Sequence, residues 1–233
     1  GSSFGIFARR FDALGLPQGT EFRVNTRTTD SQYRSSVAMD ADGDFVITWQ
    51  SGGDGSEYGI YAQCYDASGV PQGSEFRVNT WTSNAQRSPS IAMDAEGDFV
   101  ISWTSFAQDG SDLGVFAQRY NKFGDALGAE FRVNTWTTRN QWSSRVAMDA
   151  AGDFVITWHS NAQDGSGYGI YAQRYNALGA AQGSEFRVNT WTNNTQFGSS
   201  IEMDADGNFV IAWMSRGQGS YYGIFAQRYD ALG

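Results

Sequence analysis

The chain is built from one unit that is repeated along its whole length. A segment similar to Gly-Ile-Tyr-Ala-Gln-Arg-Tyr begins at Gly5, Gly59, Gly114, Gly169 and Gly223, at intervals of 54, 55, 55 and 54 residues. Because a repeated unit of this length folds as one small supersecondary structure that packs on its neighbours, the repeat decides the architecture. We predict a single repeat domain over residues 1–233. Its units cover approximately residues 5–58, 59–113, 114–168 and 169–222, followed by a partial fifth copy at residues 223–233.

Each unit predicts four short β-strands. Residues 75–79 alternate polar and apolar side chains, as a half-buried strand does. Residues 99–103 form a nearly continuous apolar run, which is typical of a strand covered on both faces. Two further strands are expected at residues 90–93 and 59–63. No segment has the periodicity of a helix, so we expect almost no helix.

The connections between these strands indicate how the units are wired. Short polar segments with glycine, such as residues 40–44 and 66–73, predict hairpins, whereas the longer segment 80–87 predicts a crossing between units. Three hairpins followed by a crossing are typical of a β-propeller blade. We therefore predict an all-β fold, a β-propeller of four-stranded antiparallel blades with about four repeats. The alternative is an open stack of small β-sheets.

The two ends of the chain leave the closure of the ring open. The last unit has three predicted strands, and the segment 21–26 could supply the fourth by strand exchange, which would close a ring of four blades. Otherwise the chain is part of a longer array whose unpaired sheet edges favour self-association.

Composition excludes several classes of function. With 16 Lys and Arg against 25 Asp and Glu, the formal charge is −9, so the chain lacks the basic surface that nucleic acids require. The single Cys64 excludes an internal disulfide framework. No apolar run approaches the ~18 residues of a membrane span, so membrane insertion is not expected. The single His159 aligns with Gln50, Thr104 and Met214 of the other units, which predicts an exposed or half-exposed strand end.

An acidic turn recurs in every unit and raises the question of calcium. Calcium prefers six or more oxygen ligands, and Asp-Ala-Asp-Gly-Asp could supply several of them. The same sequence also makes a good hairpin turn without metal, because aspartate accepts hydrogen bonds from nearby backbone N–H groups. We favour the turn and keep calcium as the candidate cofactor. The candidate metal ligands are Asp40, Asp42, Asp44, Asp94, Asp98, Asp204 and Asp206.

The crossing segments carry the candidate ligand-binding residues. Each crossing contains a glutamine, and three of them contain a tryptophan. Aromatic faces beside amide groups suit the C–H faces and hydroxyls of sugars, although a well-bonded structural loop uses the same residue types. The candidate glycan-binding residues are Trp81, Gln86, Trp136, Gln141, Trp191 and Gln196.

The amino-acid sequence of the repeat resembles that of a known type of protein. Gly-Asp-Phe-Val-Ile-Thr-Trp at residues 43–49, the segment 164–175 and Gly-Ser-Glu-Phe-Arg-Val-Asn-Thr at residues 73–80 are similar to tandem repeats of very large secreted or surface bacterial proteins. Such proteins often also carry calcium-binding or cadherin-like repeats. The resemblance covers residues 4–233. It implies an extracellular or cell-surface location and an adhesive or scaffold role, and it brings no catalytic residues.

These observations lead to three functional hypotheses. The first is a non-enzymatic binding or scaffold module, whose partners are glycans or other components of the cell surface or matrix, bound weakly at several repeated sites. The second is a purely structural segment that assembles with itself. The third, which we favour least, is an enzyme of glycosidase type, because near-identical copies argue against the single asymmetric arrangement that catalysis requires.

Overall fold

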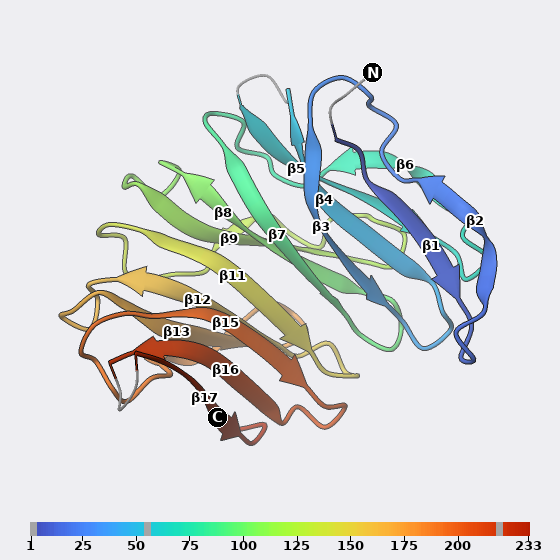
Figure 1. Cartoon of the computed structure of the whole chain (residues 1–233). Coiled ribbons are helices and arrows are strands. Elements are labelled where there is room, and N and C mark those ends of the chain that lie inside the picture. Colours follow the sequence, from blue (N-terminus) through green and yellow to red (C-terminus); the bar gives the residue numbers. More distant parts are fainter. Residues whose placement is uncertain (1–3, 54–56, 218–220) are drawn as a thin grey trace.

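The computed structural model describes residues 4–53, 57–217 and 221–233, and this part of the chain is all β (Figure 1). It contains no helix, and therefore none long and apolar enough to cross a membrane. Antiparallel sheets follow one another along the chain, and the three central sheets have four strands each. The predicted fold class is confirmed.

The sheets follow the order of the sequence. The first pairs β1 (Phe7–Phe11) with β2 (Pro17–Arg23). The second contains β3 (Gln32–Met39), β4 (Phe45–Gly52), β5 (Tyr58–Tyr65) and β6 (Pro71–Arg77). The third contains β7 (Gln86–Met93), β8 (Phe99–Phe106), β9 (Leu113–Tyr120) and β10 (Phe131–Arg132). The fourth contains β11 (Gln141–Met148), β12 (Phe154–Asn161), β13 (Tyr168–Tyr175) and β14 (Ala181–Arg187). The last contains β15 (Gln196–Met203), β16 (Phe209–Arg216) and β17 (Tyr222–Tyr229).

Adjacent sheets pack face to face through the first strand of each. These inner strands, β3, β7, β11 and β15, contact one another in series. Between the sheets lie apolar clusters built around the tryptophan of the second strand, and Trp49, Trp103 and Trp158 are almost completely buried. The second strand, which carries this tryptophan, is apolar on both sides because it is covered by a sheet on each face.

The ring is open. Strand β2 pairs with β1 and not with β17, and the two ends of the chain lie at opposite ends of the row of sheets (Figure 1). Closure by exchange of the segment 21–26 is therefore not seen.

Polar side chains on the outer strands join each sheet to the next. Glu75 accepts a hydrogen bond from the Thr26 N–H at 2.7 Å, and Glu130 accepts one from the Thr80 N–H at 2.6 Å. The arginine on the third strand donates to carbonyls in the hairpin of the following sheet, as Arg119 does to Leu178 at 2.7 Å. These glutamates and arginines bind backbone groups of the neighbouring sheet, because the turn there presents N–H and C=O groups that lack backbone partners.

We call these arginines, Arg10, Arg119 and Arg174, the arginine clamps. Replacing Arg119 with alanine should lower the free energy of unfolding by about 1–2 kcal/mol, because two charge-assisted hydrogen bonds to the next sheet are lost. Chemical denaturation measures this change. Arg132→Ala, which removes an exposed arginine from β10, is the control and should change stability by less than about 0.5 kcal/mol. Equal effects of the two substitutions would contradict the clamp.

Candidate functional site

Each inner strand has a β-bulge near its start. The pairing register with the second strand shifts at the same place in all four sheets, for example between Tyr33 and Ser36. The residue in the bulge has positive φ: 57° at Arg34, 57° at Ser88, 58° at Ser143 and 68° at Gly198. This conformation is uncommon for residues other than glycine, and bulges next to functional sites redirect side chains.

The residue before each bulge differs from sheet to sheet. It is Tyr33, Arg87, Trp142 or Phe197. Three of these are aromatic and lie edge-on to the tyrosine that begins the third strand of the same sheet. The ring centroids are 5.6 Å apart for Tyr33–Tyr58, 6.0 Å for Trp142–Tyr168 and 6.2 Å for Phe197–Tyr222. The guanidinium of Arg87 lies 5.2 Å from the ring centre of Tyr58 and forms an ion pair with Glu57 at 3.1 Å. We call this row of side chains the inner-strand rim.

Two further arginines lie on the inner strands. Nη1 of Arg34 donates to the hydroxyl of Ser88 at 2.9 Å, and Nη1 of Arg145 donates to the carbonyl of Ser144 at 2.8 Å. Burial lowers the pKa of Arg145, and the nearby positive charge of Arg34 lowers it further. Within the described residues, neither arginine has a carboxylate in ion-pair distance.

His159 lies inside the molecule, so the predicted exposed strand end is wrong. Its side chain is 3% exposed, and Nε2 accepts a hydrogen bond from the Ser199 N–H at 3.1 Å. Gln50 and Thr104, at the same place in earlier sheets, accept similar bonds from the N–H groups of Ser88 and Ser143, one position earlier on the inner strand than Ser199. Burial lowers the pKa of His159 to about 4, with a smaller effect from the charge of Arg145. The imidazole is therefore neutral at pH 7 and serves to join two sheets.

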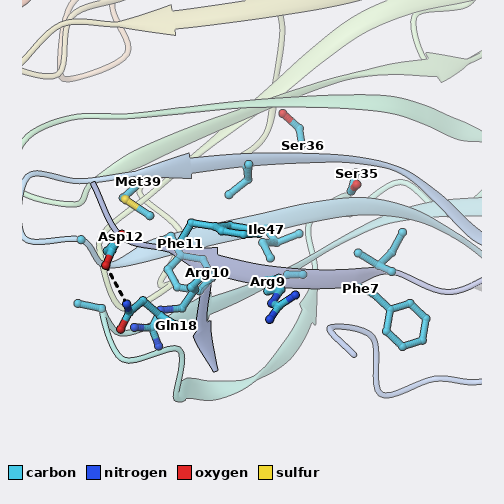
Figure 2. Close-up of a pocket in the computed structure, with 16 residues that line it drawn as sticks. Phe7, Arg9, Arg10, Phe11, Asp12, Gln18, Ser35, Ser36, Met39 and Ile47 are labelled. Atoms are coloured by element: carbon cyan, nitrogen blue, oxygen red, sulfur yellow. Dashed lines mark hydrogen bonds between the residues drawn. The ribbon is translucent and has the colours of Figure 1, made fainter. Parts of the chain in front are cut away.

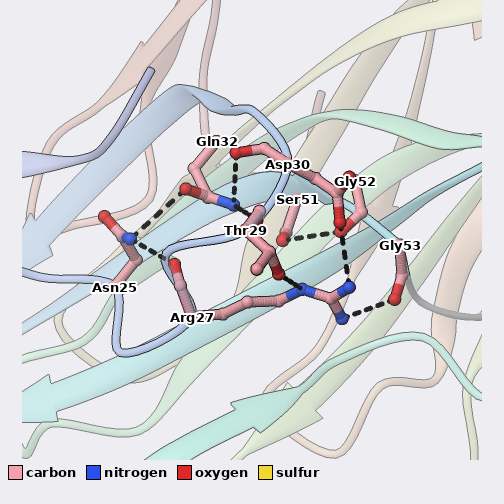
Figure 3. A network of polar contacts seen from close by, with 8 residues as sticks. All are labelled: Asn25, Arg27, Thr29, Asp30, Gln32, Ser51, Gly52 and Gly53. Carbon is pink, nitrogen blue, oxygen red and sulfur yellow. Dashed lines mark hydrogen bonds and ion pairs between the residues drawn. The ribbon is translucent and has the colours of Figure 1, made fainter. Parts of the chain in front are cut away.

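The crossing loops separate the candidate tryptophans from the candidate glutamines. Gln86, Gln141 and Gln196 are completely buried, while Trp81, Trp136 and Trp191 are between 36% and 40% exposed. The amide of each glutamine binds backbone carbonyls of its own loop and the side chain of an asparagine. Figure 3 shows the first copy, where Asn25 joins Gln32 to the carbonyl of Arg27. The glutamines hold the loop, and only the tryptophans offer a surface to a ligand.

The acidic turns are occupied by backbone hydrogen bonds. Asp40 accepts from the N–H groups of Asp42 and Asp44, and Asp44 accepts from Ala67 in the adjacent hairpin at 2.8 Å. Asp94 and Asp204 make the same pairs of local bonds. Over the described ranges, no group of three or more Asp, Glu, His or Cys residues is placed to hold a metal ion. Calcium binding at Asp40, Asp42, Asp44, Asp94, Asp98, Asp204 and Asp206 stays a prediction.

An apolar groove of about 680 Å³ lies along the free edge of β1 (Figure 2). Phe7, Phe11, Val37 and Met39 line it and are more than half exposed. In the four-stranded sheets the first and second strands occupy the corresponding place beside the third strand. The groove is thus a feature of sheet assembly, and we do not place the functional site there.

The fold is shared with propeller enzymes. No family model and no curated protein matches the chain. Among solved structures, it is similar to an α-L-arabinanase of Penicillium chrysogenum complexed with arabinobiose, at 15% identity over 85% of this chain and 62% of that one, with a TM-score of 0.59. An α-L-arabinofuranosidase of Fusarium graminearum, also complexed with arabinobiose, is 11% identical over 87% of this chain and 63% of that one, with a TM-score of 0.55. The Hadza microbial sialidase Hz136 is 10% identical over 87% of this chain and 45% of that one, with a TM-score of 0.58. The chain spans less than two thirds of the length of each, and the likeness at these identities shows the fold.

These matches correct the prediction of a non-enzymatic module. We ranked the glycosidase hypothesis last because near-identical copies argue against the single asymmetric arrangement that catalysis requires. The solved structures described above carry the names of glycosidases, and the inner strands of this chain are asymmetric, because the rim residue differs in every sheet and the bulge residue is arginine, serine or glycine. The signal was present in the sequence: the rim position holds a different residue in each copy.

Proposed function

We propose that this chain is a carbohydrate-active propeller of glycosidase type that binds its glycan at the inner-strand rim. The observation that carries the proposal is the variation of that rim on a repeated frame. Tyr33, Trp142 and Phe197 supply aromatic faces for sugar rings, and the neighbouring bulges add hydroxyl and guanidinium donors. Sugar-binding surfaces combine such aromatic faces with a few placed polar groups.

Hydrolysis by the usual route needs a pair of carboxylic acids. In the four inner strands, all of which are described, Glu202 is the single carboxylate. The inner strands alone therefore do not supply the pair. For this reason binding and hydrolysis are best measured separately.

The test compares two tryptophans of equal exposure. Trp142 on the rim and Trp81 in a crossing loop are both 39% exposed. The wild-type chain and each alanine variant are titrated by calorimetry with neutral and acidic oligosaccharides, including arabinobiose, and release of reducing ends is assayed in parallel. We expect Trp142→Ala to weaken binding about tenfold, as loss of an aromatic anchor does, and Trp81→Ala to leave it unchanged.

Two outcomes would contradict this assignment, and one further variant is the control. Loss of binding in Trp81→Ala alone would move the ligand to the crossing loops. An absence of both binding and hydrolysis with every glycan would refute the proposed function. Trp142→Phe, which introduces the residue type of Phe197, should retain most of the binding and shows that the alanine effect is not unfolding.

A further inference from the structure

We propose that the inner-strand surface contains a subsite for an acidic sugar, whose anionic group binds between Arg34 of β3 and Arg145 of β11. This inference depends on the proposed function and specifies its ligand class. The two strands lie on either side of β7, which contacts both of them. The hydroxyl of Ser88 on β7 already holds Arg34 at 2.9 Å.

Both arginines depart from the repeat. The bulge position of Arg34 is serine in the next two sheets, Ser88 and Ser143, and glycine in the last. The position of Arg145 is serine in the other three, at Ser36, Ser90 and Ser200. Small residues at these places are therefore compatible with the frame, and the fold does not require either cation.

Neither cation is neutralised by the part of the protein that the structure describes. Arg87 on the same surface pairs with Glu57 at 3.1 Å, whereas Arg34 and Arg145 have no carboxylate within 4.0 Å in the described ranges. The total charge of the chain is −9, so two unpaired and neighbouring guanidinium groups are unexpected on this background. An external anion would relieve their mutual repulsion.

The guanidinium group suits this task for geometric reasons. Its planar set of N–H donors matches a carboxylate or a sulfate with two parallel hydrogen bonds. Arg145 is exposed to solvent and so can be reached by an anion, although partial burial of its guanidinium lowers its pKa. The rim residue Trp142 lies on the same strand and could pack against the sugar ring that carries the anionic group.

The test compares an acidic sugar with its uncharged methyl ester and adds a sulfated sugar as a second anion. Trigalacturonic acid carries carboxylates, and its methyl-esterified form is the same sugar without charge. A κ-carrageenan oligosaccharide carries sulfate esters and no carboxylate. We expect the wild-type chain to bind trigalacturonic acid or the sulfated sugar at least about tenfold more tightly than the neutral ester, with affinity decreasing as salt increases. The two charged probes distinguish carboxylate from sulfate recognition.

Variants that copy the other repeats isolate the arginines. Arg34→Ser and Arg145→Ser should each remove most of the preference for the charged probe over its neutral ester. Arg132→Gln removes the same charge from the outer strand β10 and should have no effect. Arg145→Lys should restore only part of the preference, because it keeps the charge and loses the planar donors.

The failures of the two proposals differ. If glycans bind in a manner that depends on Trp142 but the acid and its ester bind equally, the acidic subsite is wrong and the proposed function stands. If the serine variants retain the full preference, the anion binds elsewhere and the subsite is also wrong. If no glycan binds to the wild-type chain, both proposals are wrong. Thermal unfolding of each variant establishes that it is folded.

Discussion

Lowering the pH from 6.5 to 4 should destabilise the protein by about 3 kcal/mol through His159 alone. Its pKa is about 4 in the folded chain, against a usual value of 6.5, because burial disfavours the charged imidazole. Between these two values the unfolded chain binds a proton that the folded chain does not. This contribution to stability is fully present above pH 6.5, decreases as the pH falls, and is lost below about pH 4.

The physical reason lies at one hydrogen bond. Nε2 accepts from the Ser199 N–H at 3.1 Å, and protonation would turn this acceptor into a donor that faces another donor. The charge of Arg145 opposes protonation as well. Urea unfolding at pH 7, 5 and 4 measures the effect. The carboxylates add their own acid sensitivity, so a variant is needed for comparison.

His159→Gln is the matched variant, because Gln50, at the same place in another sheet, accepts a similar bond from the Ser88 N–H at 3.2 Å. The variant should keep the acceptor and lose the titration. We therefore expect the wild type to lose about 3 kcal/mol more than the variant between pH 7 and pH 4. The same dependence on pH in both proteins would show that His159 is not the source.

Replacing Asn79 with alanine should lower the free energy of unfolding by about 3 kcal/mol. Oδ1 of this buried side chain accepts from the Ile60 N–H at 2.7 Å, and Nδ2 donates to the carbonyl of Trp81 at 2.7 Å and to Oε1 of Gln86 at 3.0 Å. Alanine leaves a buried N–H and two oxygens without this partner, and each such group costs about 1–3 kcal/mol if it stays unsatisfied.

Asn193→Ala is the control, because this asparagine is exposed in the equivalent loop of another sheet and contributes its backbone carbonyl to Gln196. It should change stability by less than about 0.5 kcal/mol. Chemical denaturation of both variants, together with a double-mutant cycle of Asn79 and Gln86, measures the coupling. A loss of less than 1 kcal/mol in Asn79→Ala would mean that water replaces the side chain.

The sequence predicts the sheets well where burial decides the pattern. The apolar run 99–103 lies within β8, and the alternating segment 75–79 overlaps β6, which starts and ends earlier than expected. The inner strand β7 begins at Gln86, although only residues 90–93 were predicted. Its first half was missed because the bulge at Ser88 breaks the alternation of side chains, so no regular period marks it.

The site was harder to predict than the fold. The tryptophan and the glutamine of each crossing loop lie five positions apart in the sequence, but the loop turns the amides inward, and sequence alone does not give that direction. His159 was misassigned because Gln50 and Thr104 look like surface residues. Both accept a hydrogen bond at a junction between sheets. A polar acceptor at the end of an otherwise apolar strand was the available signal.

Cys64 gives the array one junction that differs from the others. It stands where Arg10, Arg119 and Arg174 form clamps, so the sheet of β3–β6 lacks this bond to the sheet of β7–β10. In an array whose units contact mainly their neighbours, cooperativity depends on each junction in turn. The chain therefore has a preferred line of separation, and amide hydrogens beside Cys64 should exchange through partial openings that leave the sheets on either side folded.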